Sequence, residues 1–476
     1  MSKVSVEDAV VKGGGHYLHP DFVTKHSEVL KRIGRELRLP NPEYRQAMAL
    51  RDRGKYVELP DQWVLAIQRL PIAHPWGNGL QIPRAVKLNI HGAKTYDKTS
   101  FPPGEKLSLA EHIELRDYQN HSIANFKHET QGVVIAPCGA GKTTIGIGAI
   151  AAIDTPALIL VHTLDLARQW ADRVKQQLNF EASIVGGGTN DLEKGKSNRV
   201  VIATFQTICR WMWSERYDFA KQFGLLIVDE CHHVPANTFC EALMTMPQKY
   251  RLGLTATPER PDGLTNLLHW HMGKVLFEIT TQDLVNRGLV SRPVIRQVRT
   301  GWSIPGDERP EWTTIVSQMC GDDHRTQFIL DQVDILVRNE GRQVLVLSDR
   351  VAHCEQMAEE LRGEGLRASA LVGKVSKTKR AKILAAADKR EIDVIFATCL
   401  ADEGLDLPGL DTVFLTVPTK ALGRVQQRIG RIMRIREGKK TPVVYDLIDN
   451  EPFFLAMANK RAKLYRSLGC EFEERK

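Results

Sequence analysis

Residues 136–143, Ala-Pro-Cys-Gly-Ala-Gly-Lys-Thr, combine two glycines with a lysine and a hydroxyl group in a spacing that suits phosphate binding. They follow an apolar run and precede a helix-like stretch, so backbone N–H groups can face phosphate at the positive end of a helix. Lys142 can then reach the β- and γ-phosphates of ATP, and the Thr143 hydroxyl can bind Mg²⁺. A chance glycine turn is the alternative, and Ala136 replaces the glycine that opens the strict pattern. The predicted nucleotide-binding residues are Ala136, Pro137, Cys138, Gly139, Ala140, Gly141, Lys142, Thr143 and Thr144.

An acidic pair, Asp229 and Glu230, ends the apolar run of residues 225–228. Mg²⁺ bound to nucleotide prefers carboxylate and water oxygens, so Asp229 is the predicted metal ligand, through water, together with Thr143. Glu230 can orient and deprotonate an attacking water, which would make the site a hydrolase. An ordinary acidic pair between strand and loop is the alternative. We expect His232 to link this segment to the later Thr-Ala-Thr run rather than to bind metal.

The composition is that of a soluble globular protein, with 476 residues, 42% hydrophobic and 26% charged. Two or three domains are expected, because one core rarely grows beyond ~300 residues. The chain contains no run of ~18 apolar residues that could span a membrane, and the acidic Glu7 and Asp8 do not suit a signal peptide, so we expect a cytoplasmic protein. The eight cysteines show no C-x-x-C spacing, which argues against zinc and against a disulfide framework.

Positive charge is concentrated at the front of the chain. The net charge is +8, and residues 1–110 hold 17 Lys and Arg against 11 Asp and Glu, a difference of +6. A basic surface suits the phosphates of nucleic acid, although solubility alone can account for this excess.

Short β-branched runs alternate with helix-length amphipathic stretches twice after residue 111, which predicts an α/β fold of two parallel sheets. The predicted strands are residues 132–136, 157–161, 200–204, 225–228 and 251–255, then 343–347, 368–372, 394–397, 412–415 and 441–445. Residues 288–324 contain three prolines and no long apolar period, so we interpret them as an interdomain connection. A helix is expected around residues 22–37, in a front region whose fold the sequence does not name. We expect residues 453–464 to form a packing helix.

The chain over residues 111–450 resembles the superfamily 2 helicases of the DExH type, whose motifs occur here in the family's order. Gln119, in Arg-Asp-Tyr-Gln, resembles the glutamine that binds adenine. Residues 161–170 resemble motif Ia, residues 203–207 the next strand-end contact, 255–257 motif III and 345–350 motif IV. Thr398 with residues 403–406 resembles motif V, and residues 427–434, Gln-Arg-Ile-Gly-Arg-Ile-Met-Arg, match motif VI.

The resemblance implies two tandem RecA-like domains at residues 111–290 and 291–476, behind a small basic accessory domain at residues 1–110. It adds Gly404 and Asp406 to the nucleotide contacts. Its catalytic residues are Lys142, Glu230, Gln427, Arg431 and Arg434. The last two lie three apart, on one face of a helical turn, so both could point at a γ-phosphate. The implied nucleic-acid contacts are His162, Thr163, Arg168, Thr204, Gln206, Arg350 and Thr398, each of which could equally be a helix cap or a surface polar group.

Residues 257–263 and the His162 block are similar to the subgroup that contains the XPB and UvsW helicases and the motors of type I and III restriction enzymes. That subgroup implies DNA as the partner and the cytosol of a bacterium or a phage-infected host as the location. Arg84, Lys87, Trp63 and Trp76 in the front region could contact DNA, although the two tryptophans are more typical of a core. RNA in place of DNA is the main alternative. A P-loop kinase or switch acting on a small substrate, and a binding protein without catalysis, fit the second-domain motifs less well.

Overall fold

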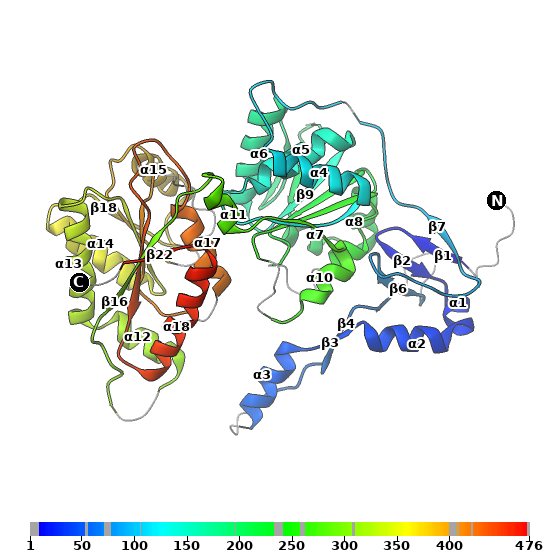
Figure 1. The fold of residues 1–476 in the computed structure, drawn as a ribbon. Coiled ribbons are helices and arrows are strands. Elements are labelled where there is room, and N and C mark those ends of the chain that lie inside the picture. The colour runs from blue at the N-terminus through cyan, green and yellow to red at the C-terminus, as the bar shows by residue number, and fades with distance from the viewer. Residues whose placement is uncertain are drawn as a thin grey trace. The chain divides into compact units, whose positions relative to one another are not determined.

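The computed structural model describes residues 9–52, 56–70, 78–104, 106–195, 197–232, 241–257, 262–306, 310–398, 407, 409–419 and 422–473. The chain divides into two compact units (Figure 1). The first contains Met1–Ala136 and Gly141–Glu278, and the second contains Ile279–Lys476 together with the short segment Pro137–Ala140.

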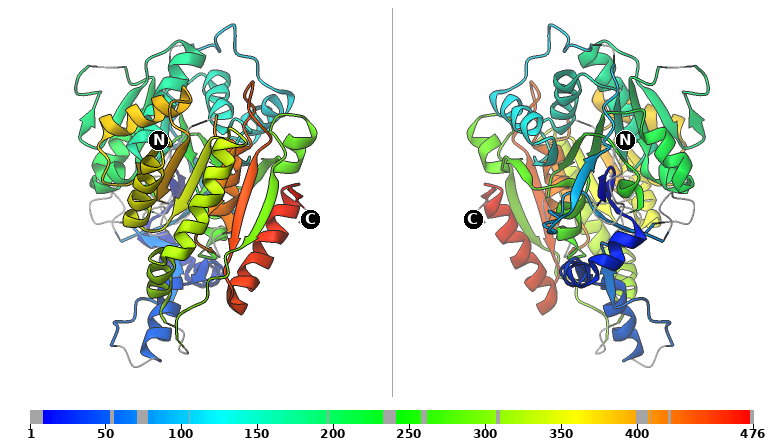
Figure 2. Two further views of the ribbon diagram at one scale, coloured as in Figure 1. Left: turned by 90° about the vertical axis from the view of Figure 1, so that its left-hand side faces the viewer. Right: turned by 90° about the vertical axis from the view of Figure 1, so that its right-hand side faces the viewer.

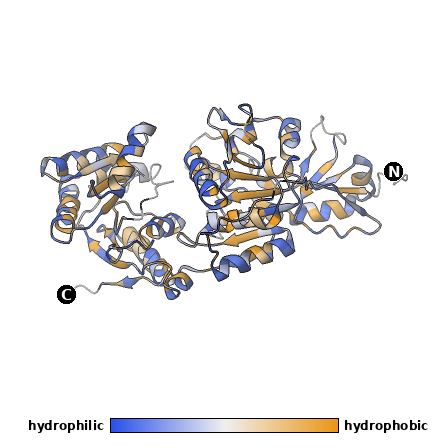
Figure 3. Ribbon diagram, turned by 90° about the horizontal axis from the view of Figure 1, so that it is seen from above, coloured by the Kyte–Doolittle hydropathy of each residue, from blue (hydrophilic) through white to orange (hydrophobic). Residues whose placement is uncertain are grey.

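The first unit is built on an eight-stranded sheet in the order β11-β10-β12-β9-β13-β14-β8-β15. All neighbours pair in parallel except β10 and β11. In this order the strands are Thr189–Asn190, Ser183–Gly186, Val200–Thr204, Ala157–Val161, Leu225–Asp229, Tyr250–Thr255, Gln131–Ile135 and Val275–Glu278. The inner strands are apolar and buried (Figure 3), as expected for a parallel sheet covered on both faces.

Helices cover this sheet on both faces (Figure 1). One face carries three successive helices that pack on one another: α4 (Asp117–Glu129), α5 (Lys142–Ile153) and α6 (Leu164–Leu178). Shorter helices belong to the same unit: α7 (Phe205–Arg210), α8 (Trp213–Ala220) and α10 (Thr265–Met272). Because these strands are parallel, the carboxyl ends of β8, β9, β12, β13 and β14 lie on one side of the sheet, where such folds bind their ligands.

The front region forms a five-stranded sheet in the order β5-β6-β2-β1-β7, which the sequence did not predict. Its strands are Gln68–Arg69, Leu80–Pro83, Gly15–Leu18, Ala9–Lys12 and Lys94–Asp97. The helix expected around residues 22–37 is two helices, α1 (Pro20–Lys25) and α2 (Ser27–Glu36), because His26 between them leaves the helical conformation with φ −107° and ψ 25°. The ribbon of β3 (Arg38–Pro40) and β4 (Trp63–Leu65) leads to α3 (Pro42–Arg51), which lies away from the sheets of its unit (Figure 1).

Buried arginines attach the front sheet to the large sheet. Arg84 is buried and donates to Gln131 Oε1 at 2.7 Å and to the Lys249 carbonyl at 2.8 Å. Arg251, on β14, is fully buried and donates to the Gly14 carbonyl at 3.1 Å. Burial lowers the pKa of Arg84 to about 10. The prediction that Arg84 contacts DNA is therefore wrong, because its guanidinium is used inside the protein. Trp63 is partly exposed under the Arg38 guanidinium, whereas Trp76 lies outside the described residues.

The second unit is built on a seven-stranded sheet in the order β18-β19-β17-β20-β21-β16-β22, with every neighbour parallel. In this order the strands are Ala368–Leu371, Val394–Thr398, Val344–Ser348, Thr412–Leu415, Val443–Ile448, Val294–Arg299 and Glu471–Phe472. Helices α13 (Asp323–Arg338) and α14 (Val351–Gly363) lie on one face, and α17 (Leu422–Ile432) and α18 (Pro452–Ser467) on the other (Figures 1 and 2). The unit also contains α11 (Thr281–Asn286), α12 (Trp312–Cys320) and α15 (Lys377–Asp388). Helix α18 confirms the expected packing helix at residues 453–464.

The interpretation of residues 288–324 as a connection is wrong. They contain β16, which lies inside the second sheet between β21 and β22, and α12, which buries Ile315 and Met319. Strand β16 escaped detection because Arg296, Gln297 and Arg299 interrupt its apolar pattern. All ten predicted strands, in contrast, overlap a strand of the structure.

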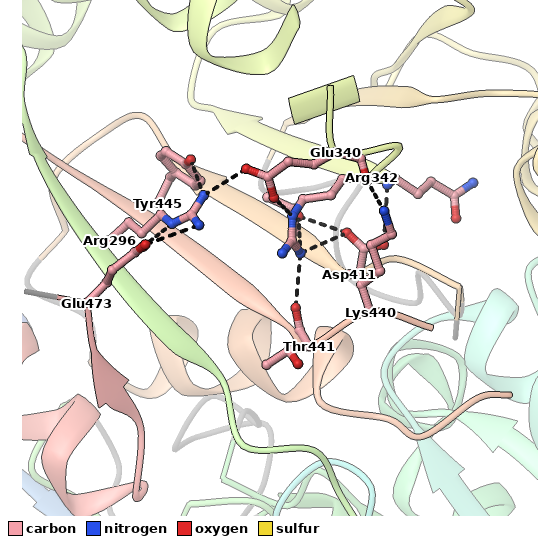
Figure 4. A network of polar contacts seen from close by, with 10 residues as sticks. Arg296, Glu340, Arg342, Asp411, Lys440, Thr441, Tyr445 and Glu473 are labelled. Atoms are coloured by element: carbon pink, nitrogen blue, oxygen red, sulfur yellow. Dashed lines mark hydrogen bonds and ion pairs between the residues drawn. The ribbon is translucent and has the colours of Figure 1, made fainter. Parts of the chain in front are cut away.

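A polar network near the amino ends of the second sheet's strands explains the charge on β16 (Figure 4). Arg296 donates to the Tyr445 hydroxyl at 2.7 Å and is paired with Glu473 near the C-terminus. Glu340 links Arg296 to Arg342, with N–O distances of 3.4 Å and 2.5 Å. These charges neutralise one another and tie β16, β21 and the C-terminal segment together.

Candidate nucleotide site

The phosphate-binding loop follows β8, and α5 begins at Lys142. Gly139 and Gly141 have φ values of +86° and +77°, in the left-handed region that favours glycine. A Cβ on Gly141 would also lie 2.6 Å from Nε2 of Gln119. These two positions therefore require glycine, and Ala136 replaces the first glycine of the pattern at a buried position directly after the strand.

Lys142 and Glu230 form an ion pair with 3.1 Å between Nζ and Oε1. The two residues are 88 positions apart in sequence, and the parallel sheet brings the ends of β8 and β13 close together. Glu230 has φ +46°, an uncommon conformation for a residue with a side chain. Such strain is concentrated at functional sites, because surrounding structure must hold it in place. The sheet thus assembles the predicted phosphate-binding lysine and the predicted general base.

Asp229 is the last residue of β13 and is buried. The indole N–H of Trp170 donates to its Oδ2 at 2.7 Å, and the backbone N–H of Glu230 donates to its Oδ1 at 3.0 Å. Burial and the neighbouring Glu230 raise the pKa of Asp229 to about 6, while Lys142 opposes this shift.

The oxygen chemistry at this position suits Mg²⁺. Each carboxylate oxygen of Asp229 accepts one hydrogen bond and retains a lone pair, and the Thr143 hydroxyl is supplied from the first turn of α5. A cation would also favour the charged form of a carboxylate whose pKa burial has raised. Within the described ranges there is no group of three or more His, Cys, Asp or Glu side chains arranged to hold a metal ion.

His232 connects the acidic pair to β14. Its Nδ1 lies 2.7 Å from the Thr255 hydroxyl in a hydrogen bond and 3.5 Å from Glu230 Oε2. The expectation that His232 links the acidic segment to the Thr-Ala-Thr run is confirmed. One connected polar cluster therefore lies at the ends of the neighbouring strands β13, β14 and β8. It contains Lys142, Glu230, His232 and Thr255.

Helix α6 supplies two contacts that the sequence did not predict. Trp170 binds Asp229, and the Gln177 amide donates to the Thr144 hydroxyl at 3.2 Å. Both side chains are buried. The sequence did carry a signal for Gln177: it is a polar residue on the apolar face of an amphipathic helix, and a buried amide needs a hydrogen-bond partner.

The predicted nucleic-acid contacts of the first unit follow β9 and β12, and several have structural partners. Thr163 caps α6 by accepting from Leu166 N at 3.2 Å, and Arg168 is paired with Asp165 at 3.1 Å. Thr204 is buried, whereas Gln206 is exposed. The His162 ring stacks on Phe205, with centroids 5.8 Å apart, and its Nε2 lies 3.2 Å from the Glu230 carbonyl oxygen. Gln119 accepts from Arg116 N at 3.0 Å and so caps α4.

The predicted residues of the second unit lie on separate elements. Arg350 donates to the Thr313 carbonyl at 2.8 Å and so contacts α12. Thr398 is buried at the end of β19, and Gly404 and Asp406 lie outside the described residues.

Gln427 and Arg431 lie on α17, but that helix ends at Ile432. Arg434 follows it and forms a β-bridge with Val290. The argument that Arg431 and Arg434 share one helical face is therefore wrong.

Comparison with known proteins identifies matches to both sheets. Residues 112–260 match the family described as type III restriction enzyme, res subunit, and residues 327–436 match the helicase conserved C-terminal domain. The chain is similar to the DNA 3'-5' helicase XPB of Mycobacterium tuberculosis, with 25% identity over 98% of this chain and 85% of that protein. It is also similar to the DNA 3'-5' translocase XPB2 of Sulfurisphaera tokodaii, with 26% identity over 69% of this chain and 80% of that protein.

Among solved structures, the chain is similar in fold to the ATP-dependent type ISP restriction-modification enzyme LlaBIII bound to DNA, with a TM-score of 0.55 and 17% identity over 75% of this chain and 30% of that one. The α/β fold with two tandem RecA-like sheets is confirmed. None of the helices in the described ranges has the length and apolar character needed to cross a membrane.

Proposed function

We propose that this chain, an ATP-dependent DNA helicase or translocase of superfamily 2 and of the XPB-like type, hydrolyses ATP with Lys142, Asp229 and Glu230. One observation carries the proposal: Lys142 Nζ lies 3.1 Å from the Glu230 carboxylate at a shared edge of the sheet. A lysine after a glycine loop binds phosphate, and a carboxylate beside it can take a proton from water. The two side chains are thus close enough to act on one terminal phosphate.

The ion pair also suggests how binding and hydrolysis are linked. Lys142 can neutralise either Glu230 or a phosphate, and the phosphates of ATP carry more charge than one carboxylate. Turning the lysine to the nucleotide releases Glu230, which then accepts a proton from the attacking water. His232 Nδ1 lies 3.5 Å from the second carboxylate oxygen and is hydrogen-bonded to the Thr255 hydroxyl, so it relates the position of Glu230 to β14.

Mg²⁺ is the metal that we infer for the site. Asp229, through water, and Thr143 would hold it, and when bound it neutralises charge on the β- and γ-phosphates. Trp170 orients the Asp229 carboxylate by donating to Oδ2, while Oδ1 accepts from the Glu230 backbone N–H.

The remaining predicted residues belong to the same proposal. Gln119 would bind the adenine, the loop residues the phosphates, and Gly404 and Asp406 the nucleotide. Arg431 and Arg434 would complete the neutralisation of the γ-phosphate, and Gln427 would belong to the same catalytic group. DNA is the partner we favour, because the XPB2 and XPB relatives are named as DNA enzymes. RNA remains the alternative, since contacts to phosphate do not read the base sequence.

The test is the ATPase rate of the purified chain, measured with single-stranded DNA, duplex DNA, forked DNA, four-way junctions and RNA side by side. We expect stimulation by DNA over RNA. Stimulation selective for junctions would indicate branch migration, whereas an equal response to plain duplex would indicate translocation. Stimulation by RNA alone would contradict the assignment of DNA as the partner.

One variant and its matched control test the site itself. Glu230→Gln removes the proton acceptor and is expected to lower turnover at least about 100-fold while ATP still binds. Glu193→Gln is the matched control, because Glu193 is an exposed residue that accepts a hydrogen bond from Asn190 at 2.6 Å on the same unit. Unchanged turnover in Glu230→Gln would show that another group is the base.

A further inference from the structure

Helix α6 contacts the candidate nucleotide site at two points on one face. Trp170 donates to Asp229 Oδ2 at 2.7 Å, and Gln177 donates to the Thr144 hydroxyl at 3.2 Å. The two donors are seven residues apart, which is about two helical turns, so they project from the same side. Asp229 belongs to the acidic pair and Thr144 to the first turn after the phosphate-binding loop. One helix thus touches both halves of the site.

The same helix is packed closely against α5. A Cβ on Gly146 of α5 would lie 2.6 Å from Cη2 of Trp170, and Ala167 and Val174 on the same face are buried. Well-packed interfaces do not deform continuously, so α6 cannot slide or rotate without disturbing α5 and both hydrogen bonds. Movement of this helix must therefore reach the residues that hold nucleotide.

Helix α6 begins directly after residues 162–163, which the sequence predicts to contact nucleic acid. Thr163 is the N-cap, and its hydroxyl accepts from Leu166 N at 3.2 Å. His162 directly precedes it, and its Nε2 lies 3.2 Å from the Glu230 carbonyl oxygen. A strand bound at this loop would hold one end of the helix whose later turns contact Asp229 and Thr144.

We propose that α6 is the element through which nucleic acid bound at residues 162–163 stimulates ATP hydrolysis, with Trp170 and Gln177 as positioning residues for Asp229 and Thr144. This inference rests on the proposed function, because it assigns a route between the two sites of the motor. Neither side chain needs to touch ATP or nucleic acid. Each acts through the residue to which it donates.

The decisive variant is Trp170→Phe, which keeps an aromatic ring in the packed interface and removes the N–H donor. The matched control is Trp302→Phe, because Trp302 is a buried tryptophan of the second unit that packs against Phe454. Three quantities are measured on each full-length protein: the affinity for a fluorescent ATP analogue, the affinity for single-stranded DNA, and the ratio of ATPase rates with and without DNA.

In Trp170→Phe we expect the stimulation ratio to fall about tenfold, the size of one charge-assisted hydrogen bond, while both affinities stay within about twofold. The Mg²⁺ concentration for half-maximal activity should rise, because Asp229 loses the donor that orients it. Trp302→Phe should keep the wild-type ratio. Gln177→Met, which removes the second donor, should lower the ratio about threefold and carries the test if Trp170→Phe does not fold.

Two results distinguish a failure of this inference from a failure of the proposed function. A wild-type chain whose ATPase does not respond to DNA or RNA would overturn the proposed function and the inference together. A normal wild-type response with an unchanged ratio in both α6 variants would overturn the inference alone. Equal losses of ATP affinity, basal rate and stimulated rate would also overturn it, since they indicate a purely structural role.

Discussion

The two sheets share a parallel architecture but use the polar residues around their strand ends differently. In the first unit Lys142 and Glu230 are paired at 3.1 Å while 12% and 19% of their side-chain surfaces remain accessible. In the second unit Asp449 follows β21 and pairs with Arg325 at 2.8 Å, with 0% and 1% accessible. Asp449 also accepts from the Thr300 hydroxyl. One pair can exchange its partner for a ligand, and the other cannot.

Burial explains why this difference separates catalysis from scaffolding. Removing one member of a fully buried ion pair leaves a charge without compensation and costs about 3–5 kcal/mol. A partly exposed pair is screened by water, so its members can part when a stronger charge arrives. The accessible pair at the strand ends of the first sheet can therefore take part in a reaction. The enclosed pair of the second sheet instead fixes the position of α13 against β21.

The sharpest test of the comparison is Lys142→Ala. We expect ATP turnover to fall at least about 1000-fold with measurable nucleic-acid binding, because the phosphate loses its cation. Steady-state ATPase and a DNA-binding titration check this. Lys221→Ala is the control, since that exposed lysine pairs with Asp218 on the surface of the same unit. Full turnover in Lys142→Ala would refute the assignment.

Asp449→Ala should act on stability instead. It leaves the Arg325 guanidinium buried, so we expect the free energy of unfolding of the second unit to fall by about 3–5 kcal/mol. Urea denaturation followed by far-UV circular dichroism measures this. Arg325→Met with Asp449→Leu should lose less, because no buried charge remains. A stable Asp449→Ala variant that has lost ATPase activity would contradict the structural role given to the Arg325–Asp449 pair.

Thr255→Val should have an intermediate effect on activity. It removes the hydroxyl that binds His232 at 2.7 Å while keeping the branched shape. The same hydroxyl donates to the Thr257 carbonyl at 2.7 Å and accepts from the Thr257 N–H at 3.2 Å. We expect an approximately tenfold lower DNA-stimulated ATPase and a stability loss of about 1–3 kcal/mol, because several hydrogen bonds are lost. Activity and denaturation measured on one preparation separate these effects. A loss of stability without a loss of rate would place His232 outside the catalytic cluster.

The smallest effect is expected for Arg350→Ala. Arg350 is partly exposed and donates to the Thr313 carbonyl, so it can serve α12, nucleic acid or both. If it contacts phosphate, DNA affinity should fall about threefold, and the slope of log affinity against log salt should decrease by about one. Fluorescence anisotropy at several salt concentrations measures this. An unchanged salt slope would leave Arg350 as a structural contact.

Local patterns predicted the parts of the fold that depend on local sequence. The β-branched runs identified ten strands, and the glycines at positions 139 and 141 were identified because a tight turn before a helix requires them. Strand β16 was missed because the charge of Arg296 is neutralised by Glu473 and Glu340, which are distant in sequence. Arg84 was misinterpreted for the same reason: its carbonyl partners lie more than 160 residues away.

The sequence by itself determined the residue types of the site, namely a glycine loop with Lys142, an acidic pair after a buried strand, and the order of the motifs. Only the tertiary structure decided which of these meet. It placed Lys142 beside Glu230, gave Asp229 a buried tryptophan donor, and ended α17 before Arg434. The reason is physical: strand and turn propensities act between near neighbours, whereas burial and polar pairing depend on residues that only the folded sheet brings together.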